Sequence, residues 1–307
     1  MLGLGLESTT FPRPLHIFDN LYSLRMDGVG DGIKITRDNS MIGDSFTYGI
    51  WVGAGEHMYS HDITSTVFAL IGNQDASGSA LQVVNKRLIA KVFVQDQSNP
   101  SDYQVIQLQT KFNRLWYAAG APLGHPENYS TAQDGWNLFV MSFHLDTLKL
   151  YVGGGIDNGG DGMGNDLHLV DSITASAGYQ GVSYDAKAHS DNVPFGIGIA
   201  FRNSNEVPVD ASFCDIDNAF YFNTNLNEGV LRTIYNNGAG IDMLAEKAAI
   251  TNGESYTSAM INDNLKMHLR MTEGSGTTLD DVSGNSNNGQ IIGDPDWVSN
   301  VPLEITN

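Results

Sequence analysis

The sequence predicts an all-β fold, an antiparallel β-sandwich with one or two short helices. Apolar and polar residues alternate with a period of two in many short segments of the 307-residue chain, and this alternation is typical of strands that are buried on one face. The segments are separated by turns rich in Gly, Asn and Asp, which favour turns over helix interiors. The chain has 34 Gly, and most of its 35 acidic residues are Asp. Many short strands joined by such turns indicate a sandwich.

The alternation also gives the approximate position of each strand. Phe46, Tyr48, Ile50 and Val52 form the longest regular apolar face near the N-terminus. The same pattern predicts strands at 22–26, 33–36, 45–52, 81–95, 103–109, 136–144, 147–152, 195–201, 215–222 and 265–271.

One segment is predicted to be a helix. Asn225 is a candidate N-cap with Glu228 three residues later, as in a capping box, and Gly238 supplies a C-terminal stop. The apolar residues between them follow at helical spacing: Val230, Leu231, Ile234 and Tyr235. Residues 239–262 are expected to form an insertion, with a second short helix and then a loop.

The charge of the chain excludes two classes of partner. Sixteen Lys and Arg against 35 Asp and Glu give a formal net charge of -19, which repels phosphate backbones and anionic lipids. We therefore expect neither nucleic-acid binding nor membrane association. No apolar run approaches the roughly 18 residues of a membrane span, and the N-terminus lacks the basic and apolar regions of a signal peptide. The single Cys214 is expected to be a buried free thiol.

Four segments occur in an order known from one group of β-sandwiches. They are LYSLRMDGVGDGIKI at 21–35, SFTYGIWV at 45–52, WNLFVMSFH with LKLYVGG at 136–154, and CDIDNAFYFNTNLNEGVLRTIYNNG at 214–238. The last, a strand followed by a polar turn and a short helix, is the most specific. Together they resemble the laminin-G-like domain of the concanavalin A-like lectin and glucanase superfamily. The resemblance covers most of 20–240 and implies a jelly-roll β-sandwich.

A further segment resembles the part that usually begins such a domain. It is LKMHLRMTEGSGTTLDDVSGNSNNGQIIGDPDW at 265–297. Since these residues are too few for a second sandwich, we expect 263–298 to close the same sheets. Residues 17–307 would then form one sandwich and residues 1–16 an extended arm. This shifted order is similar to that of laminin-G-like structural proteins of marine tailed bacteriophages.

The resemblance requires a test for catalysis, because the superfamily includes laminarinase-type glycosidases. Retaining hydrolysis needs two carboxyl groups about 5–5.5 Å apart, which in that group lie on one strand as E-x-D-x-(x)-E. No two Glu of this chain lie within four residues of each other, so we expect no catalytic residues. A pair of Asp from different loops stays open. His57 and His61 lack the Glu of H-E-x-x-H, which favours loop histidines over a zinc site.

Two sets of Asp are candidate ligands of Ca2+: Asp157, Asp161 and Asp166, and also Asp27, Asp31 and Asp217. The first set lies in the loop DNGGDGMGND, which begins like a calcium loop. Its twelfth position is His168 instead of a bidentate Glu, so it is no EF-hand, and a solvated hairpin loop is the alternative. The second set is implied by the resemblance, which places the DGVGD turn near the I-D strand. Turn and cap roles are the alternative there.

A loop of about eighteen residues is longer than structure alone requires, and such loops are often functional. It follows two aromatic residues and contains further rings and polar groups that suit a sugar. The candidate carbohydrate-binding residues are Trp116, Tyr117, His125, Asn128 and Tyr129. The alternative for Trp116 is packing beneath the loop.

These observations lead to three functional hypotheses. The first is a non-enzymatic structural protein on the exterior of a virion, as a capsid decoration, fibre or tail component. It would be made in the host cytoplasm without a signal peptide, form a homo-oligomer such as a trimer, contact other capsid or tail proteins and adhere to host glycans. The alternative is a calcium-dependent lectin module, and a glycoside hydrolase is the least favoured.

Overall fold

A computed structural model gives the fold of the chain. It describes residues 21–36, 41, 43–53, 64–70, 78–84, 87–110, 136–153, 167–183, 194–202, 207–235, 240, 243, 263–299 and 301–302. The predicted arm 1–16 and all of the predicted insertion 239–262 except Gly240 and Met243 lie outside these residues.

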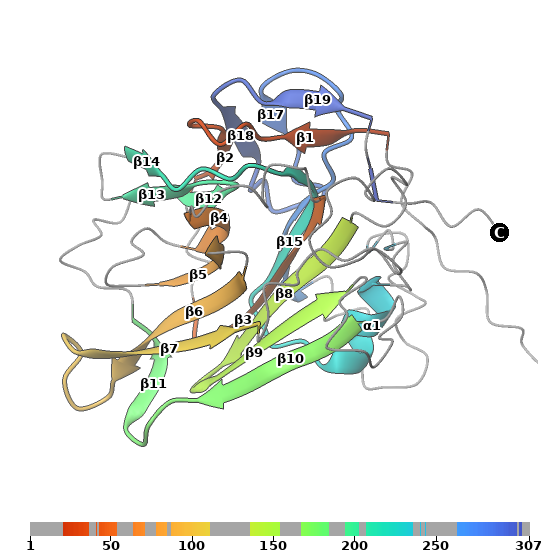
Figure 1. Cartoon of the computed structure of the whole chain (residues 1–307). Coiled ribbons are helices and arrows are strands. Elements are labelled where there is room, and N and C mark those ends of the chain that lie inside the picture. Colours follow the sequence, from red (N-terminus) through yellow and green to blue (C-terminus); the bar gives the residue numbers. More distant parts are fainter. Residues whose placement is uncertain are drawn as a thin grey trace, which may run out of the picture.

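Two antiparallel sheets face each other (Figure 1). The first sheet has the order β10 (Leu167–Thr174), β9 (Thr147–Gly153), β8 (Trp136–His144), β3 (Ser45–Gly53), β15 (Asp215–Phe222), β1 (Ser23–Arg25) and β19 (Asp296–Val298), with β16 (Leu265–Leu269) also paired to β15. The second has the order β11 (Tyr179–Val182), β6 (Arg87–Asp96), β5 (Ser79–Val84), β4 (Thr64–Leu70), β12 (Phe195–Ile197), β2 (Gly32–Ile35), β18 (Gly289–Ile292) and β17 (Thr278–Leu279), with β7 (Tyr103–Gln109) paired to β6. A third, two-stranded sheet, β13 (Ala200–Arg202) and β14 (Val207–Val209), lies beside β12 and β4. The predicted all-β antiparallel sandwich is confirmed.

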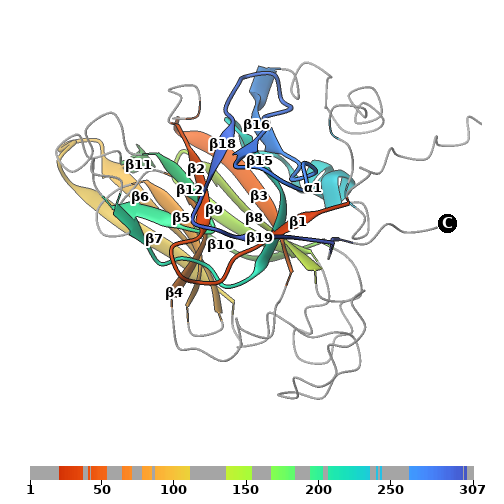
Figure 2. The ribbon, with the colours of Figure 1, turned by 90° about the horizontal axis from the view of Figure 1, so that it is seen from above.

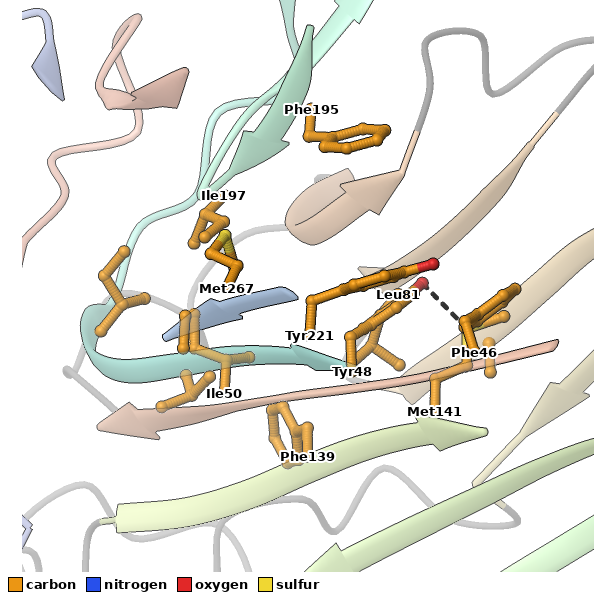
Figure 3. Close-up of a cluster of buried hydrophobic side chains, with 14 of the residues drawn as sticks. Phe46, Tyr48, Ile50, Leu81, Phe139, Met141, Phe195, Ile197, Tyr221 and Met267 are labelled. Atoms are coloured by element: carbon orange, nitrogen blue, oxygen red, sulfur yellow. Dashed lines mark hydrogen bonds between the residues drawn. The ribbon is translucent and has the colours of Figure 1, made fainter. Parts of the chain in front are cut away.

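The main core fills the space between the sheets (Figure 3). The apolar face that the alternation on β3 predicts, from Phe46 to Val52, is fully buried there. The rings of Phe46 and Tyr48 stack with centroids 5.3 Å apart, and Tyr48 Oη donates to Met141 Sδ at 2.9 Å. Each large apolar side chain buried in this way contributes about 1.5–3 kcal/mol, so this core is the main source of stability.

A second core lies on the outer face of the first sheet, beneath α1 (Glu228–Tyr235). Trp51 of β3 stacks on Tyr235 with centroids 5.6 Å apart. The predicted cap is wrong by two residues. The Val230 N–H donates to Asn227 Oδ1 at 3.0 Å, so Asn227 is the N-cap, whereas Asn225 Oδ1 accepts a bond from Ser142 Oγ of the sheet below.

Two predicted strands are each two strands in the structure. The segment 81–95 falls on β5 and β6, which pair with each other. The segment 195–201 falls on β12 and β13, which are separated by Gly198 with a φ of 71°. Glycine adopts this left-handed conformation without steric cost, so the chain can change direction at Gly198 and end β12 there. Within the described ranges α1 is the one α-helix.

The C-terminal strands belong to both sheets. β16 pairs with β15 and β19 with β1 in the first sheet, while β18 pairs with β2 in the second. The D-x-S-G-N segment between β17 and β18 is organised by Asp281. Its carboxylate accepts bonds from the N–H groups of His268, Ser283 and Asn287 and from Ser283 Oγ. The segment is therefore a structural clasp over β16.

The environment of Cys214 is apolar. Its side chain is 2% exposed, and burial raises the pKa of the thiol well above its usual range. No helix in the described part of the chain is long and apolar enough to cross a membrane.

Candidate ligand-binding surface

Two of the predicted sites lie outside the described residues. They are the carbohydrate loop with Trp116, Tyr117, His125, Asn128 and Tyr129, and the calcium loop with Asp157, Asp161 and Asp166. Both stay predictions.

The structure places Asp27 and Asp31 together in one turn between β1 and β2. Asp31 Oδ2 accepts from the Asp27 N–H at 3.0 Å and Asp31 Oδ1 from the Asp294 N–H at 3.0 Å. Asp27 Oδ1 accepts from the Val29 N–H at 2.6 Å. Burial, and then the neighbouring Asp27 carboxylate, raise the pKa of Asp31 above its ordinary value, although the two N–H bonds oppose this. These carboxylates hold the turn and its contact with Asp294.

Asp217 is not brought to this turn. Arg25 pairs with Asp215 in the antiparallel register of β1 and β15, so β15 runs away from Asp27. Asp217 therefore lies opposite Ser23, four positions or about 13 Å along the strand from Asp27. Within the described ranges, no three His, Cys, Asp or Glu side chains gather closely enough to hold a metal ion.

Within the described residues, a candidate surface for a ligand is the outer face of β6 and β7, here called the ribbon face (Figure 1). The two strands pair from Ile89 opposite Gln109 to Gln95 opposite Tyr103. Alternate residues, such as Val92 and Ile106, point into the main core. Their neighbours form the ribbon face, which consists of Ile89, Lys91, Phe93, Gln95, Tyr103, Val105, Gln107 and Gln109.

Apolar groups form the centre of the ribbon face. The rings of Phe93 and Tyr103 meet edge to face, with centroids 5.2 Å apart, and Lys91 Nζ lies 5.4 Å from the centroid of Phe93. Val105 stands opposite Phe93 and is 43% exposed. Phe93 itself is buried and fixes the orientation of the half-exposed Tyr103 ring. A rigid ring beside an exposed apolar side chain suits a flat partner with a C–H face.

Polar groups surround this centre. Gln107 and Gln109 are exposed, while Gln95 Nε2 donates to the Pro100 carbonyl at 3.2 Å. Each amide can both donate and accept hydrogen bonds. None of the eight ribbon-face residues is Asp or Glu, although the chain is strongly acidic. An apolar centre with polar groups around it can bind a polyhydroxylated ligand, but it provides no carboxyl pair for acid and base catalysis.

The sequence analysis did not identify the ribbon face, because that face depends on how two strands pair. The alternation within 81–95 and 103–109 predicts both strands but not that they are paired with each other. Only the register shows that Tyr103 and Phe93 share one face. The signal that was present is the lack of acidic residues from Ile89 to Gln95 and from Tyr103 to Gln109.

Comparison with known proteins gives similarity in structure but not in sequence. No family model and no curated protein matches the sequence. A proposed carbohydrate-binding protein from Bacteroides ovatus superposes with a TM-score of 0.51 at 12% identity, covering 96% of this chain and 63% of its own. The LG1-3 region of the laminin alpha2 chain (TM-score 0.42, 12% identity, covering 68% and 32%) and the LG4-5 domains of the mouse laminin alpha1 chain (0.36, 12%, 65% and 40%) also match.

The chain shares its β-sandwich fold with the Bacteroides protein. This confirms the fold implied by the four ordered sequence segments. At 12% identity this likeness establishes the architecture alone. The chain spans less than two thirds of the length of the Bacteroides protein.

Proposed function

We propose that the chain is a non-enzymatic, saccharide-binding module that uses the ribbon face. The observation that carries this proposal is the edge-to-face pair of Phe93 and Tyr103 beside exposed Val105, with the amides of Gln107 and Gln109 alongside. A pyranose ring has an apolar face and a polar edge, and this surface offers a partner for each. The Bacteroides protein, which is described as a proposed carbohydrate-binding protein, supports the same function.

The same surface argues against hydrolysis. Glycoside hydrolysis uses two carboxyl groups on either side of the scissile bond. None of the ribbon-face residues carries a carboxyl group, and the polar groups on this face are amides, an ammonium and a phenol. We expect binding without turnover.

The proposal extends to the setting of the module. The sequence order in which 265–297 follows 214–238 resembles laminin-G-like proteins of tailed phages, and β16 to β19 pair within the two sheets. We therefore propose an exterior virion component that forms a homo-oligomer and contacts other capsid or tail proteins. Mass spectrometry of purified particles tests this part: absence of the chain from them would overturn the virion assignment and leave the saccharide proposal standing.

The test of saccharide binding is a glycan array followed by calorimetry with the best ligand. Replacing both Tyr103 and Gln107 with Ala removes the ring and one amide. Since an aromatic contact is worth about 0.5–1.5 kcal/mol and a hydrogen bond about as much, affinity should fall at least about fivefold. Tyr22→Ala, at a tyrosine 37% exposed outside the ribbon face, is the matched control. An array without binding, or equal affinity of the double variant, would overturn the proposal.

A second experiment tests whether saccharide binding depends on Ca2+. The prediction for Asp157, Asp161 and Asp166 leads us to propose that metal assists binding through that loop. Calorimetry of chelator-treated protein with Ca2+ alone should then give heat. No heat, and no shift in Tm, would make the module independent of calcium.

A further inference from the structure

A second polar surface lies on the other sheet, beside the area that α1 covers. The register of β3, β8, β9 and β10 aligns outward-facing side chains into two rows across the strands. Row one contains Ser45, His144, Thr147 and Thr174, and row two contains Thr47, Ser142, Lys149 and Ser172. Intervening residues such as Phe46 and Phe143 point into the main core.

One half of row two already binds amide groups of the chain itself. Thr47 Oγ1 donates to the Thr224 carbonyl at 2.9 Å and accepts from the Leu226 N–H at 2.9 Å. Ser142 Oγ donates to the side-chain amide oxygen of Asn225 at 2.6 Å. The two hydroxyls on this face thus contact the C=O of one peptide group, the N–H of the next peptide group and a side-chain amide oxygen. The connection from β15 to α1 is held to the sheet in this way.

The other half of the rows, on β9 and β10, is open. Thr174 and Ser172 are exposed, and Thr147 and Lys149 are half-exposed. Strands lie about 4.8 Å apart, so these four side chains form a compact square. His144 of β8, also exposed, borders it and is held by Ser45 Oγ at 2.6 Å from its Nδ1.

The hydrogen bonds within the square fix what each atom can offer. Thr147 Oγ1 donates its proton to Asp146 Oδ1 at 2.8 Å, so in its 3.1 Å bond with Thr174 the donor is Thr174 Oγ1. Thr174 Oγ1 therefore presents lone pairs to a ligand. Lys149 Nζ presents donors. Thr174 and Lys149 stand on a diagonal of the square, about 7–8 Å apart. The N–H and C=O of a trans amide point in opposite directions, so an acceptor on one side and a donor on the other match one acetamido group.

We propose that this square is a second saccharide site, specific for an N-acetylated sugar. The acetamido N–H donates to Thr174 Oγ1 and its carbonyl accepts from Lys149 Nζ, while Ser172 and His144 contact ring hydroxyls. The carboxylate of Asp146, beside Thr147, disfavours an acidic ligand. A non-polar ligand is disfavoured because neither row contains an apolar side chain. This inference goes beyond the ribbon face and stands without it.

The test is calorimetry of the full chain with triacetylchitotriose and with cellotriose, which lacks the acetamido groups. We expect triacetylchitotriose to bind at least about tenfold more tightly, since each of two hydrogen bonds is worth a few-fold. Thr174→Val and Lys149→Met should each weaken its binding about three- to tenfold and leave Tm within a few degrees. Equal affinity for the two trisaccharides, or unchanged binding by both variants, would overturn the proposal.

Two controls separate this site from the ribbon face and from a protein partner. The Tyr103→Ala and Gln107→Ala double variant should keep the preference for triacetylchitotriose over cellotriose; if that preference is lost, the acetamido group is recognised on the ribbon face and the second site is refuted. An acetylated, amidated dipeptide should bind far more weakly than the sugar. Tighter binding of the dipeptide would show that the square recognises a polypeptide, which also refutes the saccharide assignment.

Discussion

Replacing Asp281 with Ala should be among the most damaging single changes in the C-terminal segment. The side chain is 9% exposed, and its two oxygens accept four hydrogen bonds that join β16 to the D-x-S-G-N segment. Alanine leaves the N–H groups of His268 and Asn287 without an acceptor, and both of these bonds are buried.

The size of the effect follows from those two donors. A buried donor left without a partner costs about 1–3 kcal/mol, so the two together cost about 2–6 kcal/mol. The two bonds from Ser283 are less buried and add less. Because a domain is stable by only about 5–15 kcal/mol, Asp281→Ala should lose a large fraction of the total.

The assay is urea unfolding followed by tryptophan fluorescence. Asp281→Asn keeps the oxygen that faces His268 and Ser283 and loses the one that faces Asn287, so it should fall between the parent and Asp281→Ala. Asp280→Ala, at the exposed neighbour, should change stability by less than about 0.5 kcal/mol. If Asp281→Ala unfolds at the same urea concentration as Asp280→Ala, the clasp described above is not a source of stability.

Three further predictions concern other parts of the fold. Asn227→Ala should destabilise the protein by about 1 kcal/mol in urea unfolding through loss of the N-cap of α1; an equal loss in a Glu228→Ala control would point to the helix surface instead of the cap. Gly181→Ala should lower Tm by a few degrees, because Gly181 has a φ of 75°, which costs alanine about 1–2 kcal/mol, while the exposed Asp44 carboxylate can turn away from the added Cβ; a wild-type Tm contradicts this. Because the folded-state pKa of Asp31 is raised, the folded protein holds its proton to higher pH than the unfolded chain. The stability of the parent relative to Asp31→Asn should thus be greatest at acid pH and fall as pH rises from about 3.9 through the raised pKa; urea unfolding at several pH values checks this, and a difference that grows with pH would refute the assigned cause.

The sequence predicts those parts of the fold that depend on local pattern. The alternation from Phe46 to Val52 identifies β3 because burial on one face requires that period. It does not predict the irregularity in β15, where the register shifts between Asp217 and Phe220 and Asn218 has a φ of 44°. That shift depends on β3, β16 and β1 all pairing with one strand, which is not a local property.

The candidate surfaces depend on the register between separate strands, which the alternation within one strand does not give. Tyr103 of β7 meets Phe93 of β6, and Thr174 of β10 meets Thr147 of β9. Each partner is an ordinary strand residue when taken alone. Asn225 illustrates the same limit: its spacing suits a helix cap, but Ser142 on a distant strand binds its side chain instead.

The pairing of β1 with β19 has a mechanical consequence. Ser23 is the register partner of Val298 and Arg25 that of Asp296, so the two strands lie side by side in opposite directions (Figure 2). The chain therefore enters the sandwich at Ser23 and leaves it at Val298 through adjacent points. A force that pulls these two points apart acts across the strand pair and breaks its hydrogen bonds one after another, as in a zipper. The sandwich should yield from this corner under low tension while the sheets around β3 and β8 remain intact.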